Sequence, residues 1–232
     1  SPILVSQGDI RMNIFALSKC PDESAEQMIN KHITKMPTET CQMLHTNILF
    51  MNYVEEYNRE PSLAELKEYH QSINSSLMKP AMLNHPSTIW ARQSIANFHW
   101  LFQHGIALCE EYTYRYGKRH GSHNRILYGM RQRGDNYVFP VKGLTPVSIA
   151  MADEYRLDRD EYFEQNPNNT EWDFVNDSYK HYYLQGKWEF AEWRMDRRPD
   201  WFPTNWYAKQ YNKGVRAYNA KQPRYPLILM EE

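Results

Sequence analysis

Apolar and aromatic side chains crowd the chain between Ile89 and Tyr112. Their spacing follows one face of a helix, which is expected to begin at His85-Pro86-Ser87 and to bend at Gly105. A helix with so many large apolar side chains must lie in a hydrophobic core. The set comprises Ile89, Trp90, Ile95, Phe98, Trp100, Leu101, Phe102, Ile106, Leu108 and Tyr112.

Shorter patterns around this helix predict a mainly α protein. Met12–Leu17 is an apolar run typical of a short strand, and Asp22 is placed to cap a helix that Pro37 kinks or restarts. Ser62 and Glu65 form a capping box for a polar helix. Two further helices are expected, over about 124–131 and 172–193.

With 232 residues, the chain is long enough for one large domain. We expect a compact helical domain over 12–196, with a peripheral insert at 58–80. An irregular aromatic and basic tail, 197–232, is expected to pack on this domain. Residues 1–11 precede Met12 and are either an upstream extension or a remnant added ahead of the protein.

Composition excludes several classes of protein. Three scattered cysteines are too few for a disulfide framework or a zinc cluster, so a reducing, cytoplasmic setting is expected, that of the host cell if a phage encodes the chain. No apolar run approaches the roughly 18 residues that span a bilayer. The 17 Tyr and 7 Trp residues are suited to stacking on bases or sugars, although surplus rings can also be core.

Cations gather between Thr113 and Gly134, where no Asp or Glu occurs, although the formal net charge of the chain is only -1. A local field of this kind is typical of a phosphate-binding surface. A solvated basic face without a ligand would give the same pattern. The candidate nucleic-acid contacts here are Arg115, Lys118, Arg119, His120, Arg125, Arg131 and Arg133.

The tail forms a second basic segment. Between Arg197 and Arg224 it carries seven Lys or Arg residues against one acid, Asp200, interleaved with aromatic rings. Cations that neutralise phosphates and rings that stack on bases are what a nucleic-acid backbone and its splayed bases require. Trp201, Lys209 and Lys213 are therefore candidate nucleic-acid contacts. The alternative is that these rings only cover the core.

A candidate catalytic set lies on the first long helix. His32, Lys35 and Glu39 have the spacing of one helix face and are flanked by apolar residues. An imidazole, an amine and a carboxylate could transfer protons or supply a nucleophile, provided that burial tunes their pKa values. A surface helix with an ordinary ion pair gives the same spacing.

Other candidate pocket residues are His85, Trp90, Glu111 and Tyr112. His85 could donate to an anion at a helix N-terminus, although a cap is the simpler role, and Trp90 is most simply core. Glu111 is close enough in sequence to pair with Arg115. No histidine spacing indicates a zinc site, and phosphate-loop and dinucleotide fingerprints are absent, so no metal and no cofactor is predicted.

Four segments carry a resemblance to known families. Met12-Asn-Ile-Phe, Lys31-His-Ile-Thr-Lys-Met36, Asn84-His-Pro86 with Trp90, and Glu111-Tyr-Thr-Tyr-Arg-Tyr-Gly-Lys118 are similar to a family of largely uncharacterised tailed-phage proteins. More remotely, the order of parts resembles the phage endonuclease V type of pyrimidine-dimer DNA glycosylase. That resemblance implies a compact helical fold that kinks DNA, flips a base and forms a Schiff base through its terminal amine, assisted by a glutamate.

Two positions differ from the pattern of that enzyme family. Lys35 of Lys35-Met36-Pro37 stands where the family has its glutamate, and residues 1–11 displace the terminal amine. The hypothesis from the sequence is that the DNA-binding frame persists. Its chemistry either shifted to Lys35 as the amine and Glu39 as the carboxylate, or was replaced by another reaction on bases.

Three classes of function stay open on the sequence alone. The first is an enzyme acting on double-stranded DNA, either a damaged-base glycosylase or a base-modifying transferase. The second is a non-catalytic nucleic-acid-binding protein that uses the same cations. The third is an enzyme acting on free nucleotides, for which a compact cationic pocket would suffice.

Overall fold

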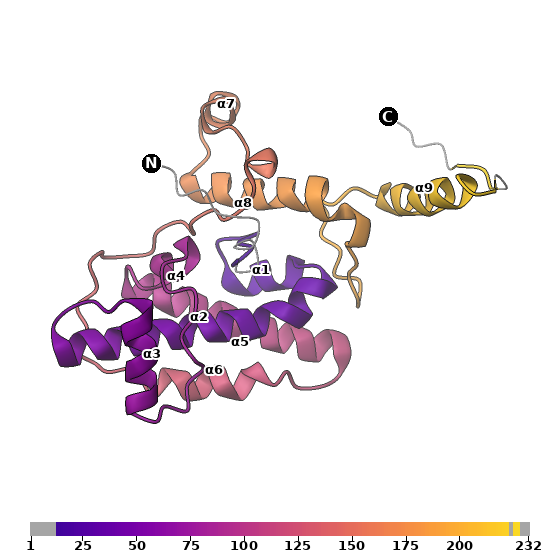
Figure 1. The fold of residues 1–232 in the computed structure, drawn as a ribbon. Helices are drawn as coiled ribbons and strands as arrows, with labels where there is room; N and C mark the ends of the chain where they lie inside the picture. Colours follow the sequence, from indigo (N-terminus) through magenta and orange to yellow (C-terminus); the bar gives the residue numbers. More distant parts are fainter. Residues whose placement is uncertain (1–12, 223–224, 228–232) are drawn as a thin grey trace.

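The computed structural model describes residues 13–222 and 225–227 (Figure 1). Within these ranges the protein is helical and contains no strand, so the mainly α prediction is confirmed. Two long helices, α2 (Asn30–Tyr57) and α5 (Ile95–Tyr116), pack against each other. The helix α6 (Ser122–Met130) covers both of them.

The first long helix differs from the prediction at two places. Residues expected to be continuous divide into α1 (Pro21–Gln27) and α2, because Met28 and Ile29 are extended. Pro37 neither ends nor restarts α2, which continues for five further turns to Asn58 in the left-handed conformation. Burial on nearly all sides explains this continuity, since packing outweighs the one backbone hydrogen bond that proline removes.

The aromatic helix is also divided, but not at Gly105. It comprises α4 (Pro86–Ala91) and α5, and Ser94 between them caps α5 by accepting a hydrogen bond from the Asn97 amide. Gly105 lies inside α5, where an added Cβ would be 3.1 Å from a carbon of Thr40 and 3.2 Å from Ile126. The glycine therefore permits the close approach of α5 to its neighbours rather than a bend.

The peripheral helix α3 (Leu63–Ser72) has the predicted capping box of Ser62 and Glu65, and it packs on the C-terminal half of α2. Beyond α6 the chain runs without regular structure to a 3₁₀ turn, Asp153–Tyr155, and then forms α7 (Arg159–Gln165) and α8 (Glu171–Tyr182). In Figure 1, α8 lies above α1 and α2, on the opposite side of them from α6.

A π-helical turn, Tyr183–Lys187, and a 3₁₀ turn, Trp188–Phe190, extend α8. The tail expected to be irregular contains a further helix, α9 (Trp206–Asn219), which projects from the rest of the molecule in Figure 1. Among the described tail residues, Phe202 and Trp206 belong to the hydrophobic core and Trp201 packs against it.

The predicted N-terminal strand is not present over residues 13–17, and Met12 lies outside the described residues. This segment is nevertheless buried in the core. No neighbouring strand pairs with it; instead the Asn13 side chain accepts hydrogen bonds from the amides of Ile14 and Phe15, and the Ser24 hydroxyl bonds to Phe15 and Leu17. Phe15 has a φ of 53°, which is incompatible with a strand.

Candidate functional site

Lys35 and Glu39 lie one turn apart on α2, and the structure brings their charged groups together. The Lys35 Nζ is 3.7 Å from the Glu39 Oε1. The two side chains differ in environment, because 54% of the Lys35 side chain but only 17% of that of Glu39 is exposed. The pair therefore places an accessible amine beside a largely buried carboxylate.

Burial raises the pKa of Glu39 to about 7, although the neighbouring Lys35 acts in the opposite direction. Its second carboxylate oxygen, Oε2, is buried and has no hydrogen-bond partner within the described ranges. A carboxylate in this state holds a proton more readily than an ordinary glutamate, so it can exchange protons near neutral pH.

His32 is near this pair but is a packed side chain. Its ring stacks on Phe15, with 4.0 Å between the ring centroids, and its Nδ1 lies 2.7 Å from the Tyr183 hydroxyl. Burial first, and then the charges of Lys187, Lys35 and Lys31, lower its pKa well below the usual value. His32 is thus neutral at physiological pH, and its exposure of 5% leaves it little access to a substrate.

Two other lysines adjoin this site and were not among the sequence candidates. The Lys31 Nζ lies 4.6 Å from the centroid of the Phe190 ring, and the Lys187 Nζ lies 5.3 Å from the same centroid. We call Lys31, Lys35 and Lys187 the lysine cluster. The only sequence signal was Lys31 one helical turn before Lys35, since nothing in the sequence predicted the π-helical turn that positions Lys187.

The second group of cations lies on α6 and on the residues that follow α5 and α6. We call Lys118, Arg119, Arg125, Arg131 and Arg133 the α6 surface. All but Arg133 are exposed, and none forms an ion pair with a described residue. Arg119 donates to the Asn124 side chain. Phosphate binding by this group stays a prediction from the sequence.

His120, on the same surface, is partly committed to the fold. One of its ring nitrogens lies 3.0 Å from the Thr34 carbonyl oxygen, and the other accepts a hydrogen bond from the Ser122 amide. Its ring also contacts Tyr112, which is half-buried beside Tyr116. His120 and Tyr112 therefore join α5 to the start of α2 and support the α6 surface.

Arg115 does not lie on that surface, although the sequence placed it there. It is 4% exposed, and its guanidinium donates to Glu111 and to the backbone carbonyls of Glu26 and Met28. These carbonyls lie at the end of α1, where a helix leaves its acceptors unpaired. Arg115 caps α1, so we exclude it from the phosphate contacts.

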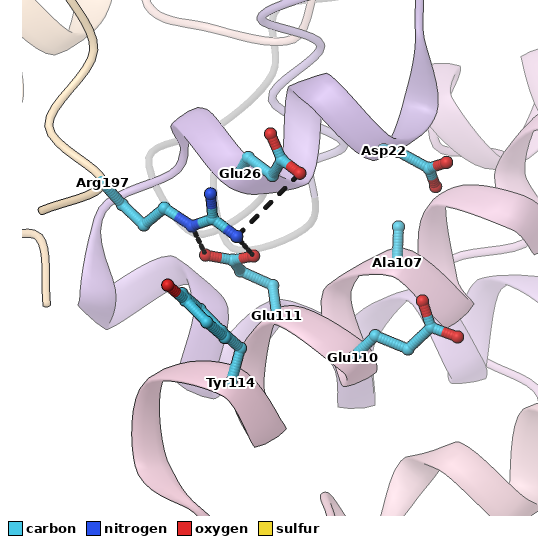
Figure 2. Close-up of a pocket in the computed structure, with 7 residues that line it drawn as sticks. All are labelled: Asp22, Glu26, Ala107, Glu110, Glu111, Tyr114 and Arg197. Carbon is cyan, nitrogen blue, oxygen red and sulfur yellow. Dashed lines mark hydrogen bonds and ion pairs between the residues drawn. The ribbon is translucent and has the colours of Figure 1, made fainter. Parts of the chain in front are cut away.

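Glu111 also binds Arg197 from the tail, as Figure 2 shows, with 3.0 Å between the Arg197 Nε and the Glu111 Oε1. The Arg197 guanidinium lies 4.4 Å from the centroid of the Tyr114 ring and 4.0 Å from Glu26. Glu111 is therefore a structural partner of two arginines, one from its own helix and one from the tail.

These residues line a cavity of about 290 Å³ between α1 and α5 (Figure 2). Asp22 and Glu110 face its other side. Within the described residues, no group of three or more His, Cys, Asp or Glu side chains is arranged to hold a metal ion.

His85 and Trp90 both have structural positions. His85 is the N-cap of α4, where its Nδ1 accepts a hydrogen bond from the Ser87 amide. Trp90 is 1% exposed and donates its indole N–H to the Thr145 carbonyl. Within the described residues, neither side chain is observed to contact Lys35 or Glu39.

The tail residues divide in the same way. Trp201 donates to the Gln27 side chain and packs near Tyr183, so it covers the core. Lys209 and Lys213 lie on α9, and Lys213 forms an ion pair with Glu189. In Figure 1, α9 and α6 occupy different ends of the molecule, so the two basic segments of the sequence do not form one surface.

The site thus belongs to a helical protein with an amine–carboxylate pair on its first long helix and exposed cations on a neighbouring one. Residues 12–125 match the family model of the pyrimidine dimer DNA glycosylases, which confirms the resemblance found in the sequence. The match covers α1 to the middle of α6, including Lys35, Glu39 and the first half of the α6 surface.

No match was found among curated proteins or among solved structures. The family match supports a DNA glycosylase-like function in general terms, with DNA as the substrate. Within the described residues, no helix is both long and apolar enough to cross a membrane. The residues after Arg125, including α8 and the π-helical turn, lie outside the matched segment.

Proposed function

We propose that the protein is a glycosylase that acts on damaged pyrimidines in duplex DNA, with the Lys35 amine as nucleophile and Glu39 as its proton acceptor. The observation that carries the proposal is the 3.7 Å contact between an exposed amine and a carboxylate whose pKa burial raises to about 7. An ordinary carboxylate takes a proton from an ammonium group far less readily.

The chemistry follows from this pair. Glu39 takes a proton from the Lys35 ammonium group, and the resulting neutral amine attacks C1′ of the damaged nucleotide. The bond from C1′ to the base breaks, its electron pair goes to the departing base, and Glu39 gives the base the proton that came from Lys35. Glu39 takes a proton from the attached nitrogen. It then returns that proton to the sugar ring oxygen as the C1′–O bond opens, which leaves a Schiff base between Lys35 and the sugar.

Access to C1′ in a duplex requires that the nucleotide leave the base stack. The α6 surface supplies cations that can hold the flanking phosphates during this step, because no described carboxylate neutralises them. A base-modifying transferase, a non-catalytic DNA-binding protein and an enzyme on free nucleotides would lack the covalent intermediate, so trapping this intermediate separates them from the glycosylase.

The test is borohydride reduction in the presence of a duplex that contains a cyclobutane pyrimidine dimer. The intact protein is expected to form a stable adduct with DNA, and Lys35→Ala is expected to abolish it. Lys67→Ala, on the peripheral helix α3, is the matched control and should leave the adduct unchanged. An adduct that survives Lys35→Ala would overturn the assignment of the nucleophile, and no adduct with the intact protein would overturn the chemistry.

A further inference from the structure

The lysine cluster gathers three positive charges, and no contact among the described residues that stabilises the fold explains why they lie together. Lys31 and Lys35 come from the first turns of α2, whereas Lys187 ends the π-helical turn that extends α8. The Nζ atoms of Lys31 and Lys187 lie 4.6 Å and 5.3 Å from the centroid of the Phe190 ring. Two segments separated by about 150 residues thus bring their ammonium groups to one place.

Among the described residues, no carboxylate forms an ion pair with Lys31 or Lys187, and Glu39 is engaged with Lys35. Burial, together with the charges of Lys31 and Lys35, lowers the pKa of Lys187. Like charges gathered in this way repel one another, and an anion bound between them would remove that repulsion.

The local structure holds Lys187 in place. A π-helical turn is rare and occurs mostly at functional sites. Gly186 precedes the lysine, and an added Cβ there would be 3.0 Å from the Tyr155 ring. The Lys187 Nζ also lies 5.2 Å from the centroid of the Tyr182 ring, so two aromatic rings are near its ammonium group. Phe190, at 40% exposed, leaves the cluster open to solvent.

We propose that Lys31 and Lys187 bind one phosphate group beside Lys35. The ligand chemistry is a phosphate mono- or diester, because two ammonium groups without a planar fork suit a compact anion rather than a planar carboxylate. The inference rests on the proposed function in one respect: the expected occupant is a phosphodiester of the DNA strand that carries the damaged nucleotide. A nucleotide's own phosphate is the other source of the same chemistry.

This site differs from the α6 surface in position and composition. It combines α2 with residues 183–190, which lie outside the segment matched by the family model. A phosphate here would lie next to the Lys35 amine, whereas the α6 surface holds the backbone at a distance. The proposed role of Lys31 and Lys187 is therefore positioning of the strand rather than chemistry.

The experiment measures binding of an undamaged duplex oligonucleotide at several salt concentrations. The double variant K31Q/K187Q is expected to lower the slope of log affinity against log salt by about one unit, the value for one phosphate contact. The matched control K67Q/K142Q removes the same charge from α3 and from the exposed Lys142, and it should leave the slope unchanged. The charge-retaining variant K31R/K187R should keep the slope of the parent.

A second arm titrates thymidine 5′-monophosphate into the same proteins by calorimetry. An unchanged duplex slope together with loss of nucleotide binding in K31Q/K187Q would support the phosphate site but assign it to a free nucleotide, which counts against the proposed function. No change in either arm would overturn the inference. The borohydride adduct reports on Lys35 alone, so the two proposals fail separately.

The melting temperature distinguishes a binding role of Lys31 and Lys187 from a role in packing. Because the lysines repel one another in the absence of a ligand, K31Q/K187Q is expected to melt at the same temperature as the parent or higher. The inference would be overturned if K31Q/K187Q melted several degrees below the parent while K31R/K187R kept the parent's melting temperature, and neither variant changed the salt slope. That result would mean that the two lysines contribute to packing.

Discussion

Arg115 is close in sequence to the cations of the α6 surface, but it differs from them in its burial and in its partners. Arg115 is buried, and its donors are used by a carboxylate, two backbone carbonyls and the Asn30 side chain. Lys118, Arg119, Arg125 and Arg131 are exposed and lack a described ion-pair partner. The comparison teaches that a run of basic residues can contain both a structural group and a binding surface.

Arg115→Ala should produce the largest effect on stability. It leaves Glu111 with Arg197 alone and removes the donors to the Glu26 and Met28 carbonyls, and breaking such a buried pair costs about 3–5 kcal/mol. Urea unfolding measures the loss. Arg131→Ala, on the exposed side of the comparison, is the control and should change stability little. A stable Arg115→Ala variant that binds DNA weakly would place Arg115 back among the phosphate contacts.

The Lys35–Glu39 pair lies between the two extremes, since one member is exposed and the other largely buried. The pKa of Glu39 is raised from 4.5 to about 7, so its contribution to stability is complete below pH 4.5 and is lost as the pH rises through 7. Glu39→Gln mimics the protonated form and keeps that contribution. At pH 8 the variant should therefore be more stable than the parent, by on the order of 2 kcal/mol.

The measurement is urea unfolding of Glu39→Gln and of the parent at pH 4.5 and pH 8. The two proteins should be nearly equal at the lower pH and differ at the higher one. Glu68→Gln on α3, an exposed glutamate, is the control and should show no such pH dependence. Equal stability at both pH values would show that burial does not raise the pKa of Glu39 to near 7.

Local patterns in the sequence predicted the parts that depend on neighbouring residues. The capping box of Ser62 and Glu65, the contact of Lys35 with Glu39 and the burial of the α5 aromatic residues all depend on helical spacing. The predicted restart of the helix at Pro37 was wrong, because packing on several sides keeps α2 continuous there, and α5 is likewise continuous through Gly105.

The parts that depend on distant residues could not be predicted. Arg115 looked like its exposed neighbours because its acceptors, the carbonyls at the end of α1, are almost 90 residues away. Lys187 had no local signal, since only the π-helical turn and the packing of Phe190 bring it to Lys31. Both are tertiary effects that override the charge pattern.

Removing Lys118 and Arg125 tests the exposed side of the comparison directly. The double variant K118Q/R125Q should lower the slope of log affinity for duplex DNA against log salt by about two units and weaken binding about tenfold near 0.1 M salt. Its stability should be close to that of the parent, in contrast to Arg115→Ala. An unchanged salt slope in a stable K118Q/R125Q variant would show that the α6 surface is a solvated basic face that does not bind DNA.

Lys213 on α9 should give the smallest effect, although the sequence made it an equal candidate. It forms an ion pair with Glu189, so its charge is already offset, and α9 and α6 lie at different ends of the molecule (Figure 1). Lys213→Gln should therefore leave the salt slope for a 12-base-pair duplex unchanged. Glu189→Gln, which frees Lys213, is the matched control and should also leave it unchanged. A decrease in the salt slope as large as that of K118Q/R125Q would show that α9 and α6 bind the same duplex as one surface.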